Sequence, residues 1–179
     1  MKKKLFRIFW ILLVALFIIY NMGLDIGTLH LGKQKDDIEV NNHYDIKSSD
    51  FYKQFLSTDQ LVVINLWATW CKPCVEEMPM FLELQKEFPD VRFATLSIDK
   101  DSGKLKDFLM KNKSLPDVTL QNAAYRKAIR NFLENRSEKS LIYTEIVPIT
   151  YFIKSGKVVK KIEGSMDKKE ITSIIGSLK

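Results

Sequence analysis

Between residue 44 and the C-terminus, apolar residues follow patterns that predict alternating strands and helices. The run 61–66 is short, apolar and rich in β-branched residues, which is typical of a buried strand. After residue 74, apolar side chains return every three or four positions, which predicts an amphipathic helix packed on a sheet. Its apolar positions are Val75, Met78, Phe81, Leu82, Leu84 and Phe88. The first predicted unit is therefore a strand, a tight loop and a helix.

The middle of the chain continues this alternation. Residues 91–98 are mostly apolar, as in a central strand covered on both faces, and Ser102 is a candidate cap for a helix that includes residues 105–109. Residues 116–120 predict a short strand or an extended link. Asn122 is a candidate cap for a helix in which apolar pairs recur every four residues. These pairs are Ala124/Tyr125, Ala128/Ile129 and Phe132/Leu133.

The last part of the chain predicts a hairpin and a closing helix. Two strand-like runs, 149–153 and 157–162, flank a serine–glycine pair, which is a two-residue hairpin signal. Asp167 and Glu170 form a pair that resembles a capping box at the start of a helix. The apolar face of this helix is Ile171, Ile174, Ile175 and Leu178. The whole pattern predicts an α/β fold with a mixed β-sheet that helices cover on both faces.

The N-terminal segment has a different pattern. Residues 8–20 are an unbroken apolar run, preceded by the cationic residues Lys2, Lys3, Lys4 and Arg7. This pattern is typical of a signal peptide or a signal anchor. With its apolar neighbours the run can reach the length of a bilayer span, and residues 21–23 match a signal-peptide cleavage site poorly. We therefore expect an uncleaved transmembrane anchor over residues 1–24, with cleavage and release to the periplasm as the alternative. The cationic flank predicts that the rest of the chain lies outside the cytoplasm.

Length and charge add two constraints. A chain of 179 residues allows one domain and an appendage. We expect a tether over residues 25–43, which are polar and lack a clear period, and a folded domain over residues 44–179. The formal net charge of +6 comes largely from the N-terminal lysines and does not form a basic stripe interleaved with aromatic residues. This distribution argues against nucleic-acid binding.

The candidate chemistry lies in the loop between the first strand and its helix. Cys71 and Cys74 are the only cysteines, and they fall at the N-terminus of the predicted helix. The unpaired N–H groups and the dipole at this position lower the pKa of a thiol, and two cysteines at this spacing can close a disulfide. Pro73 suits a first helical turn, and Lys72 adds a positive charge. These features favour thiol–disulfide exchange, which needs a reactive outer thiol and a resolving inner thiol.

Two alternatives compete with exchange. A structural disulfide across so small a loop constrains the unfolded chain little. A zinc site needs four ligands, and the only histidines, His30 and His43, lie far upstream. We therefore expect no metal, and no cofactor other than a redox-active Cys71–Cys74 disulfide.

Two segments resemble a known family. Asn65–Pro79 resembles the active-site segment of thioredoxin-like proteins, most closely the membrane-anchored, extracytoplasmic branch typified by TlpA and ResA. Val147–Ile153 resembles the cis-proline of that family and the core strand after it. The resemblance covers the chain from about residue 44 to its end. It implies a thioredoxin-like fold, with the α/β insertion of the TlpA/ResA branch between the second strand and Pro148.

The resemblance also implies roles for individual residues. Cys71 is expected to be the nucleophile and Cys74 the resolving cysteine. A cis Val147–Pro148 bond is expected opposite Cys71, which leaves the backbone of Val147 free to pair with an extended substrate. Trp70 is a candidate for contact with that substrate.

Glu77 is a candidate proton shuttle for Cys74. It lies one helical turn after that cysteine, and proteins of the TlpA/ResA type with a glutamate at this offset use it in this way. Plain thioredoxins instead place a buried aspartate in the preceding strand, where this chain has Asn65, which cannot exchange a proton in the same way. The alternative for Glu77 is an ordinary carboxylate near a helix start, which is what we expect of Glu76.

The expected function is reduction of protein disulfides outside the cytoplasm. The Lys-Pro pair between the cysteines is closer to the Gly-Pro and Glu-Pro of reducing relatives than to the Pro-His of oxidising ones. The resemblance implies a membrane thiol donor of the DsbD or CcdA type, and apocytochrome c is a substrate typical of the family. The alternatives are a disulfide oxidase or isomerase, and a non-catalytic binding module with an inert disulfide.

Overall fold

The structure is a computed structural model that describes residues 2–22, 24–26, 29–31, 36–38, 44–136 and 146–179. The chain divides into two compact units, Met1–Asp36 and Asp37–Lys179. Parts of the predicted tether, and the polar loop after residue 136, lie outside the described residues.

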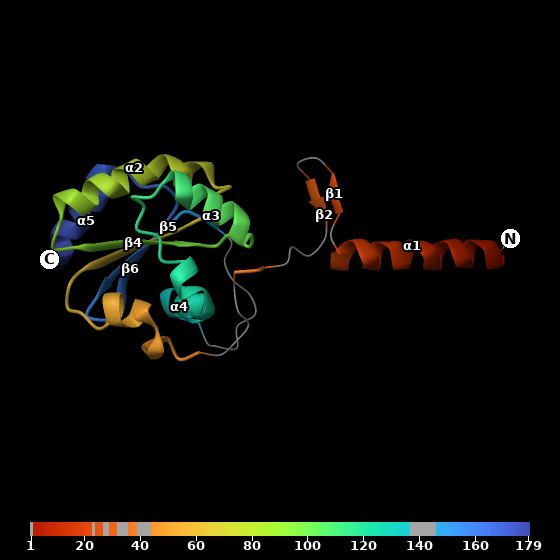
Figure 1. Cartoon of the computed structure of the whole chain (residues 1–179), viewed down its shortest axis with the longest axis horizontal. Coiled ribbons are helices and arrows are strands. Elements are labelled where there is room, and N and C mark those ends of the chain that lie inside the picture. The colour runs from red at the N-terminus through yellow and green to blue at the C-terminus, as the bar shows by residue number, and fades with distance from the viewer. Residues whose placement is uncertain (1, 23, 27–28, 32–35, 39–43, 137–145) are drawn as a thin grey trace. The chain divides into compact units, whose positions relative to one another are not determined.

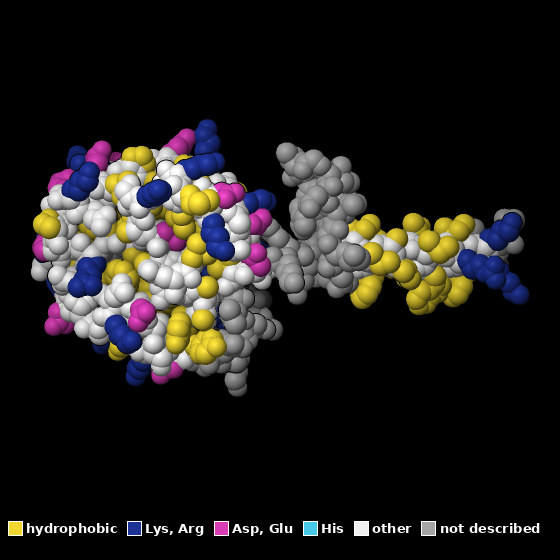
Figure 2. All heavy atoms as spheres, in the orientation of Figure 1, with side chains coloured by type: hydrophobic (Ala, Val, Ile, Leu, Met, Phe, Trp, Pro, Cys, Tyr) yellow, Lys and Arg dark blue, Asp and Glu magenta, His cyan; other side chains and the backbone are white. Residues whose placement is uncertain are grey.

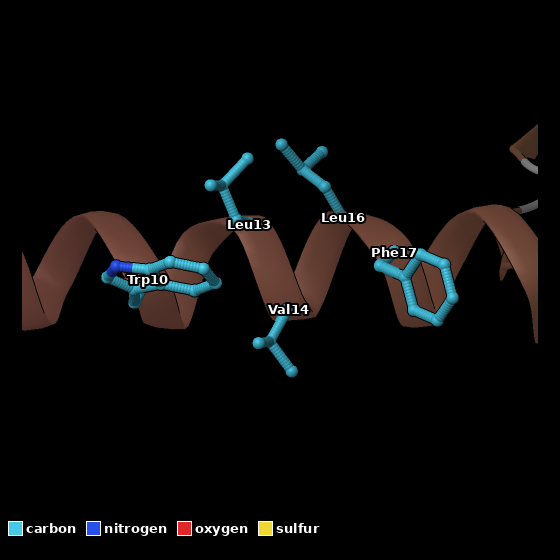
Figure 3. A pocket seen from close by; sticks show the side chains of 5 residues that line it. All are labelled: Trp10, Leu13, Val14, Leu16 and Phe17. Carbon is cyan, nitrogen blue, oxygen red and sulfur yellow. The ribbon is translucent and has the colours of Figure 1, made fainter.

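The N-terminal unit consists of helix α1 (Lys2–Met22) and two short strands, β1 (Leu24–Ile26) and β2 (Leu29–Leu31), which pair antiparallel. The large apolar side chains of α1 from Phe6 to Ile18 are between 41% and 68% exposed. Figure 2 shows these side chains along the helix and basic side chains at its N-terminal end. Figure 3 shows five of the apolar side chains of α1, namely Trp10, Leu13, Val14, Leu16 and Phe17. Figure 3 shows that Leu13 and Val14 leave the helix in opposite directions, so α1 has apolar residues around its circumference.

Among the residues that the structure describes, no helix combines the length and the apolar character needed to cross a bilayer. The transmembrane anchor over residues 1–24 stays a prediction. Within the predicted tether over residues 25–43, the described residues include most of the β1–β2 pair.

The larger unit is built on a four-stranded mixed sheet with the order β4-β3-β5-β6. Strand β3 (Val62–Trp67) pairs parallel with β4 (Arg92–Ser97) and antiparallel with β5 (Ile149–Lys154), which pairs antiparallel with β6 (Lys157–Glu163). Every residue of β3 is buried, as its apolar sequence predicts. Helix α2 (Lys72–Glu87) connects β3 to β4 and contains Pro79.

Two apolar layers lie on the two faces of this sheet, and Figure 1 shows helices on both sides of it. On one face, α2 and α5 (Lys168–Leu178) pack against alternate residues of β3 and β4, such as Val63 and Phe93. The other layer contains Ile64 and residues of α3 (Ser102–Lys111), α4 (Arg126–Leu133) and the helical turn η2 (Tyr52–Leu56). The short turn η1 (Ile46–Ser48) precedes η2. The expected mixed sheet between helical layers is therefore confirmed.

The hairpin and the last helix follow the predicted pattern. Ser155 and Gly156 both have positive φ angles, 49° and 68°, as a tight two-residue β-turn requires. A Cβ atom at position 156 would lie 2.8 Å from the carbonyl oxygen of Leu56, so a glycine fits this close approach. At the start of α5, the side chain of Asp167 accepts a hydrogen bond from the backbone N–H of Glu170 at 2.8 Å.

Two predicted helix caps were wrong. Asp101, one residue before Ser102, caps α3 by accepting from the backbone N–H of Lys104 at 2.9 Å. Asn122 lies inside the helical turn η3 (Leu120–Tyr125), and α4 begins only after it. Its side chain accepts from the backbone N–H of Phe51 and donates to the carbonyl oxygen of Val118. A buried amide here satisfies backbone groups of other segments, which local sequence cannot show.

The extended link after α3 is confirmed. Asp117 forms an isolated parallel bridge with Thr95, and the backbone N–H of Val118 donates to the carbonyl oxygen of Thr95 at 2.9 Å. This segment therefore lies along the outer edge of β4.

Candidate active site

Cys71 and Cys74 form a disulfide at the start of α2. The sulfur atoms are 2.01 Å apart and the Cα atoms 5.3 Å apart. Cys71 is the N-cap residue of α2, and its Sγ accepts a hydrogen bond from the backbone N–H of Cys74 at 3.3 Å. The side chains are 5% and 1% exposed, so Cys71 is slightly more accessible than Cys74. This is the placement that the sequence predicts.

The surroundings of the pair favour a negative charge on Cys71 after reduction. A thiolate at this position lies at the N-terminus of a 16-residue helix, where the helix dipole and the free N–H groups stabilise an anion. The ammonium group of Lys72 is exposed and lies 3.7 Å from the carboxylate of Glu76. Because this pair is exposed, its contribution to the reactivity of Cys71 is small.

The Val147–Pro148 peptide bond is cis, as the resemblance implied. Its position relative to the disulfide follows from the sheet register. Ile149, the first residue of β5, pairs with Leu66 near the end of β3, and the loop to Cys71 begins after Trp67. The cis bond and the cysteine loop therefore lie at the same end of the sheet. Trp70, directly before Cys71, is 63% exposed at this end.

Glu77 is half-buried on α2. Its carboxylate accepts a hydrogen bond from the backbone N–H of Met166 at 2.7 Å, which ties α2 to the segment before α5. Burial raises the pKa of this carboxyl group, although the hydrogen bonds from Met166 and from the side chain of Ser165 partly oppose the shift. A carboxyl group with a raised pKa is better suited to accept and return a proton near neutral pH than an ordinary surface glutamate.

Asn65 lies in a row of buried polar side chains that crosses the sheet. Its neighbours in register are Thr95 on β4 and Thr150 on β5, and its amide donates to the hydroxyl of Thr150 at 3.3 Å. Asp117 continues this row beyond Thr95. The position where plain thioredoxins hold an aspartate therefore carries an amide with a satisfied hydrogen bond.

Sequence reasoning missed two carboxylates close to the cysteine loop. The first is Asp117, which accepts hydrogen bonds from the indole N–H of Trp67 at 2.9 Å, the hydroxyl of Thr95 at 3.0 Å and the backbone N–H of Thr119 at 3.0 Å. Burial raises its pKa, and these hydrogen bonds oppose the shift. The indole of Trp67 is fully buried against Phe108, so Asp117 fixes the residue that ends β3.

The second missed carboxylate is Asp99, which follows β4. It accepts two hydrogen bonds from Thr69, one from the backbone N–H at 2.8 Å and one from the hydroxyl at 2.7 Å. Ser97 donates a third at 2.6 Å. A signal for it existed, because the carboxyl ends of parallel strands gather functional groups at one edge of a sheet. An acid placed directly after a predicted central strand is therefore a candidate site residue.

Within the described ranges, no group of three or more His, Cys, Asp or Glu side chains is placed to hold a metal ion.

Comparison with known proteins shows which family and which relatives the chain is similar to. The family model described as "AhpC/TSA family" matches residues 31–162. The chain is 31% identical over 111 residues to the thioredoxin-like protein YneN of Bacillus subtilis, covering 62% of this chain and 60% of YneN. It is 30% identical over 114 residues to the thiol-disulfide oxidoreductase ResA of Bacillus cereus (strain ATCC 10987), covering 62% of this chain and 58% of ResA. The matched part thus spans about three fifths of each relative.

Among solved structures, the fold is similar to that of the pneumococcal exposed lipoprotein thioredoxin Etrx1 from Streptococcus pneumoniae. The TM-score is 0.54 at 22% identity, and the match covers 68% of this chain and 87% of that one. At this identity the likeness shows a common thioredoxin-like fold.

Proposed function

Because the chain belongs to the AhpC/TSA family of thioredoxin-like proteins, we propose that it is a thiol–disulfide oxidoreductase that works through Cys71 and Cys74. The observation that carries the proposal is the disulfide between these cysteines at the N-terminus of α2. Relatives named as thioredoxin-like protein and thiol-disulfide oxidoreductase support it. A purely structural role is a poor alternative, because the bridge closes a separation of only three residues.

The direction we propose is reduction of protein disulfides. In the reduced protein, the thiolate of Cys71 attacks a substrate disulfide, forming a mixed disulfide and releasing one substrate thiolate, which takes up a proton. The thiolate of Cys74 then attacks the sulfur of Cys71, releasing the second substrate sulfur as a thiolate, which takes up a proton, and leaving the Cys71–Cys74 disulfide. Two electrons pass from the protein to the substrate, and the disulfide of this structure is the product state.

Glu77 is the group we propose for the proton of Cys74. The inner thiol is almost fully buried, so its thiolate is costly to form without a base. The carboxylate lies one turn further along the same helix, and burial raises its pKa. During resolution it accepts the proton from Cys74, and re-reduction of the pair returns that proton to the sulfur.

The substrate surface that we propose consists of Trp70, Val147 and Pro148. The exposed indole precedes the nucleophile, and the cis bond lies at the same end of the sheet. We expect the backbone N–H and C=O groups of Val147, next to the cis bond, to pair with an extended segment that carries the target disulfide.

We further propose that the domain works outside the cytoplasm, held at the membrane by its N-terminal segment. The support is the cationic flank and the apolar side chains exposed along α1. An exchangeable thiol pair in such a compartment needs a supply of electrons, for which a membrane thiol donor of the DsbD or CcdA type is suitable. Maturation of cytochrome c is one pathway that uses such a reductase. Alkaline carbonate extraction and N-terminal sequencing test the location, and a soluble product that starts near residue 25 would contradict the anchor.

The decisive measurement is the reduction potential of the Cys71/Cys74 pair, equilibrated against glutathione and dithiothreitol. We expect a value near that of thioredoxin, about −270 mV, and far from the roughly −120 mV of a strong oxidase. The protein should also reduce insulin with dithiothreitol as electron source, and the double variant Cys71→Ala/Cys74→Ala is the control. A potential in the oxidising range would reverse the direction, and no activity above the control would leave a binding module.

A further inference from the structure

Asp99 lies outside the cysteine motif and is tied to it by hydrogen bonds. Its side chain is 3% exposed, and its two oxygens accept from the N–H and hydroxyl of Thr69 and from the hydroxyl of Ser97. A carboxylate that accepts on both oxygens matches three donors, whereas an amide offers only one accepting oxygen. The three donors therefore match the two oxygens of a carboxyl group better than the single oxygen of an amide.

The loop that Asp99 holds leads directly to the nucleophile. Thr69 is two residues before Cys71, and the backbone N–H of Cys71 closes the turn by donating to the carbonyl oxygen of Ala68 at 3.1 Å. The same loop is fixed at its start, where the carbonyl oxygen of Trp67 accepts from the backbone N–H of Ile98 at 2.8 Å. The loop of residues 67–71 is thus anchored to the end of β4 at Trp67, through Ile98, and at Thr69, through Asp99.

The backbone of Asp99 is itself held by hydrogen bonds to Arg126 and Ser97. The guanidinium group of Arg126, which is fully buried, donates to the backbone carbonyl oxygen of Asp99 at 2.5 Å. The backbone N–H of Asp99 donates to the hydroxyl of Ser97 at 2.9 Å. The carboxylate therefore has little freedom to follow a shift of the loop.

We propose that Asp99 is a positioning residue for thiol–disulfide exchange and acts through Thr69. It fixes the loop so that the sulfur of Cys71 stays at the helix N-terminus, in reach of the backbone N–H of Cys74. The inference rests on the proposed exchange function. Its physical basis is that a small misplacement of a reacting group has a large cost in rate, up to about a hundredfold for roughly 1 Å.

The test is a double-mutant cycle in the full chain with Asp99→Asn, Thr69→Val and the double variant. Thr69→Ser keeps the hydroxyl and is the rescue variant. Asp101→Asn is the matched control, because Asp101 is also an acid after β4 and caps α3 without contact to the loop. Each variant is assayed for kcat and KM of insulin reduction, for the pH profile of Cys71 alkylation by iodoacetamide, and for urea unfolding.

We expect Asp99→Asn to lower kcat about tenfold with little change in KM, and Thr69→Val to lower kcat several-fold. The double variant should be no slower than Asp99→Asn, because both changes break the same contact. Thr69→Ser and Asp101→Asn should behave as wild type. Thr69→Val should move the alkylation profile to higher pH, because the Cys71 thiolate loses its fixed place at the helix N-terminus.

Three results would overturn the proposal. One is a double variant whose loss is the product of the two single losses. In another, Thr69→Val behaves as wild type and the alkylation profile of Asp99→Asn moves to lower pH. Asp99 would then act only through its charge. The third is equal loss in Asp101→Asn. If Asp99→Asn does not fold, the Thr69→Val and Thr69→Ser pair still decides between position and charge.

The alkylation assay separates this inference from the proposed function. Iodoacetamide reacts with the Cys71 thiolate and needs no disulfide substrate. The distinguishing outcome is a wild-type protein that fails to reduce insulin while the alkylation profile of Thr69→Val is still shifted to higher pH. That pair of results would contradict the exchange function and leave the positioning role of the loop intact.

Discussion

Helices α2 and α5 begin with the same capping geometry and differ in the atom that caps them. At α5, an oxygen of Asp167 accepts from the backbone N–H three residues later at 2.8 Å. At α2, the sulfur of Cys71 accepts from the backbone N–H three residues later at 3.3 Å. Aspartate is among the preferred residues at such a position, and sulfur is a weak acceptor. The start of α2 is therefore poorly capped by ordinary standards.

The difference between the oxygen cap of α5 and the sulfur cap of α2 corresponds to different roles of the two helix starts. The cap of α5 stabilises the fold, whereas the weak cap of α2 leaves N–H groups available to a thiolate when the disulfide opens. Glu77 connects the two, because it lies in α2 and accepts from the N–H of Met166, one residue before the cap of α5. Packing of Met78, Phe81 and Leu84 holds α2 in place despite its cap.

The largest effect is expected when the sulfur cap is exchanged for an oxygen. Cys71→Ser places a better helix cap at the same position and removes the nucleophile, so insulin reduction should be lost completely while α2 remains folded. Circular dichroism and the insulin assay measure the two effects. Measurable turnover in Cys71→Ser would show that Cys74 or another group can attack the substrate.

The second largest effect is expected when the carboxylate of Glu77 is removed. General-base assistance is typically worth about 10²–10⁴-fold, and because Glu77 is only half-buried we expect Glu77→Gln to slow turnover by about a hundredfold or less. Formation of the disulfide should be largely unaffected. Stopped-flow reduction of a substrate disulfide across pH is the measurement. Glu76→Gln, at the neighbouring exposed position, is the control, and a larger loss in that variant would reject the role of Glu77.

A change at the cap of α5 should affect stability and leave exchange intact. Asp167→Ala removes the acceptor for the N–H of Glu170, which should lower the free energy of unfolding by about 1 kcal/mol. Urea unfolding measures the loss, and the insulin assay should give the wild-type rate. Slower exchange in Asp167→Ala would mean that the start of α5 takes part in placing Glu77.

The smallest effect concerns the pH dependence of stability. Burial raises the pKa of Glu77 above its ordinary value of 4.5, so in the window between the two values the folded protein binds more protons than the unfolded one. The free energy of unfolding should therefore fall as pH rises through that window and become level above it. Glu77→Gln should remove this component of the slope in urea unfolding at a series of pH values, and an unchanged slope would contradict the raised pKa.

The sequence predicts those structural features that neighbouring residues in the chain determine. The apolar run before Cys71 becomes the buried strand β3, the serine–glycine pair at 155 and 156 becomes the hairpin turn, and Asp167 caps α5. The cis bond at Pro148 was predicted by resemblance, because nothing in a single Val-Pro pair separates it from an ordinary turn. These features need only neighbouring residues or a known motif.

The rest depends on contacts between distant segments. Asp99 and Thr69 are 30 positions apart, and Asn122 and Phe51 are 71 apart. In each case a polar side chain satisfies a backbone group that is left without a partner only after the chain has folded. Asn122 has the local signature of a helix cap and a different role in the structure, because the tertiary contact is the more favourable use of a buried amide.

The edges of the two outer strands, β4 and β6, affect how readily the domain associates with copies of itself. An exposed strand edge is a template on which a second molecule can add a strand and begin a fibre. The outer edge of β4 is occupied by the segment around Asp117, which bonds to Thr95. The other outer strand, β6, carries exposed lysines at 157, 160 and 161, whose charges repel an identical strand laid beside it. Both edges therefore disfavour edge-to-edge pairing of two copies of the domain.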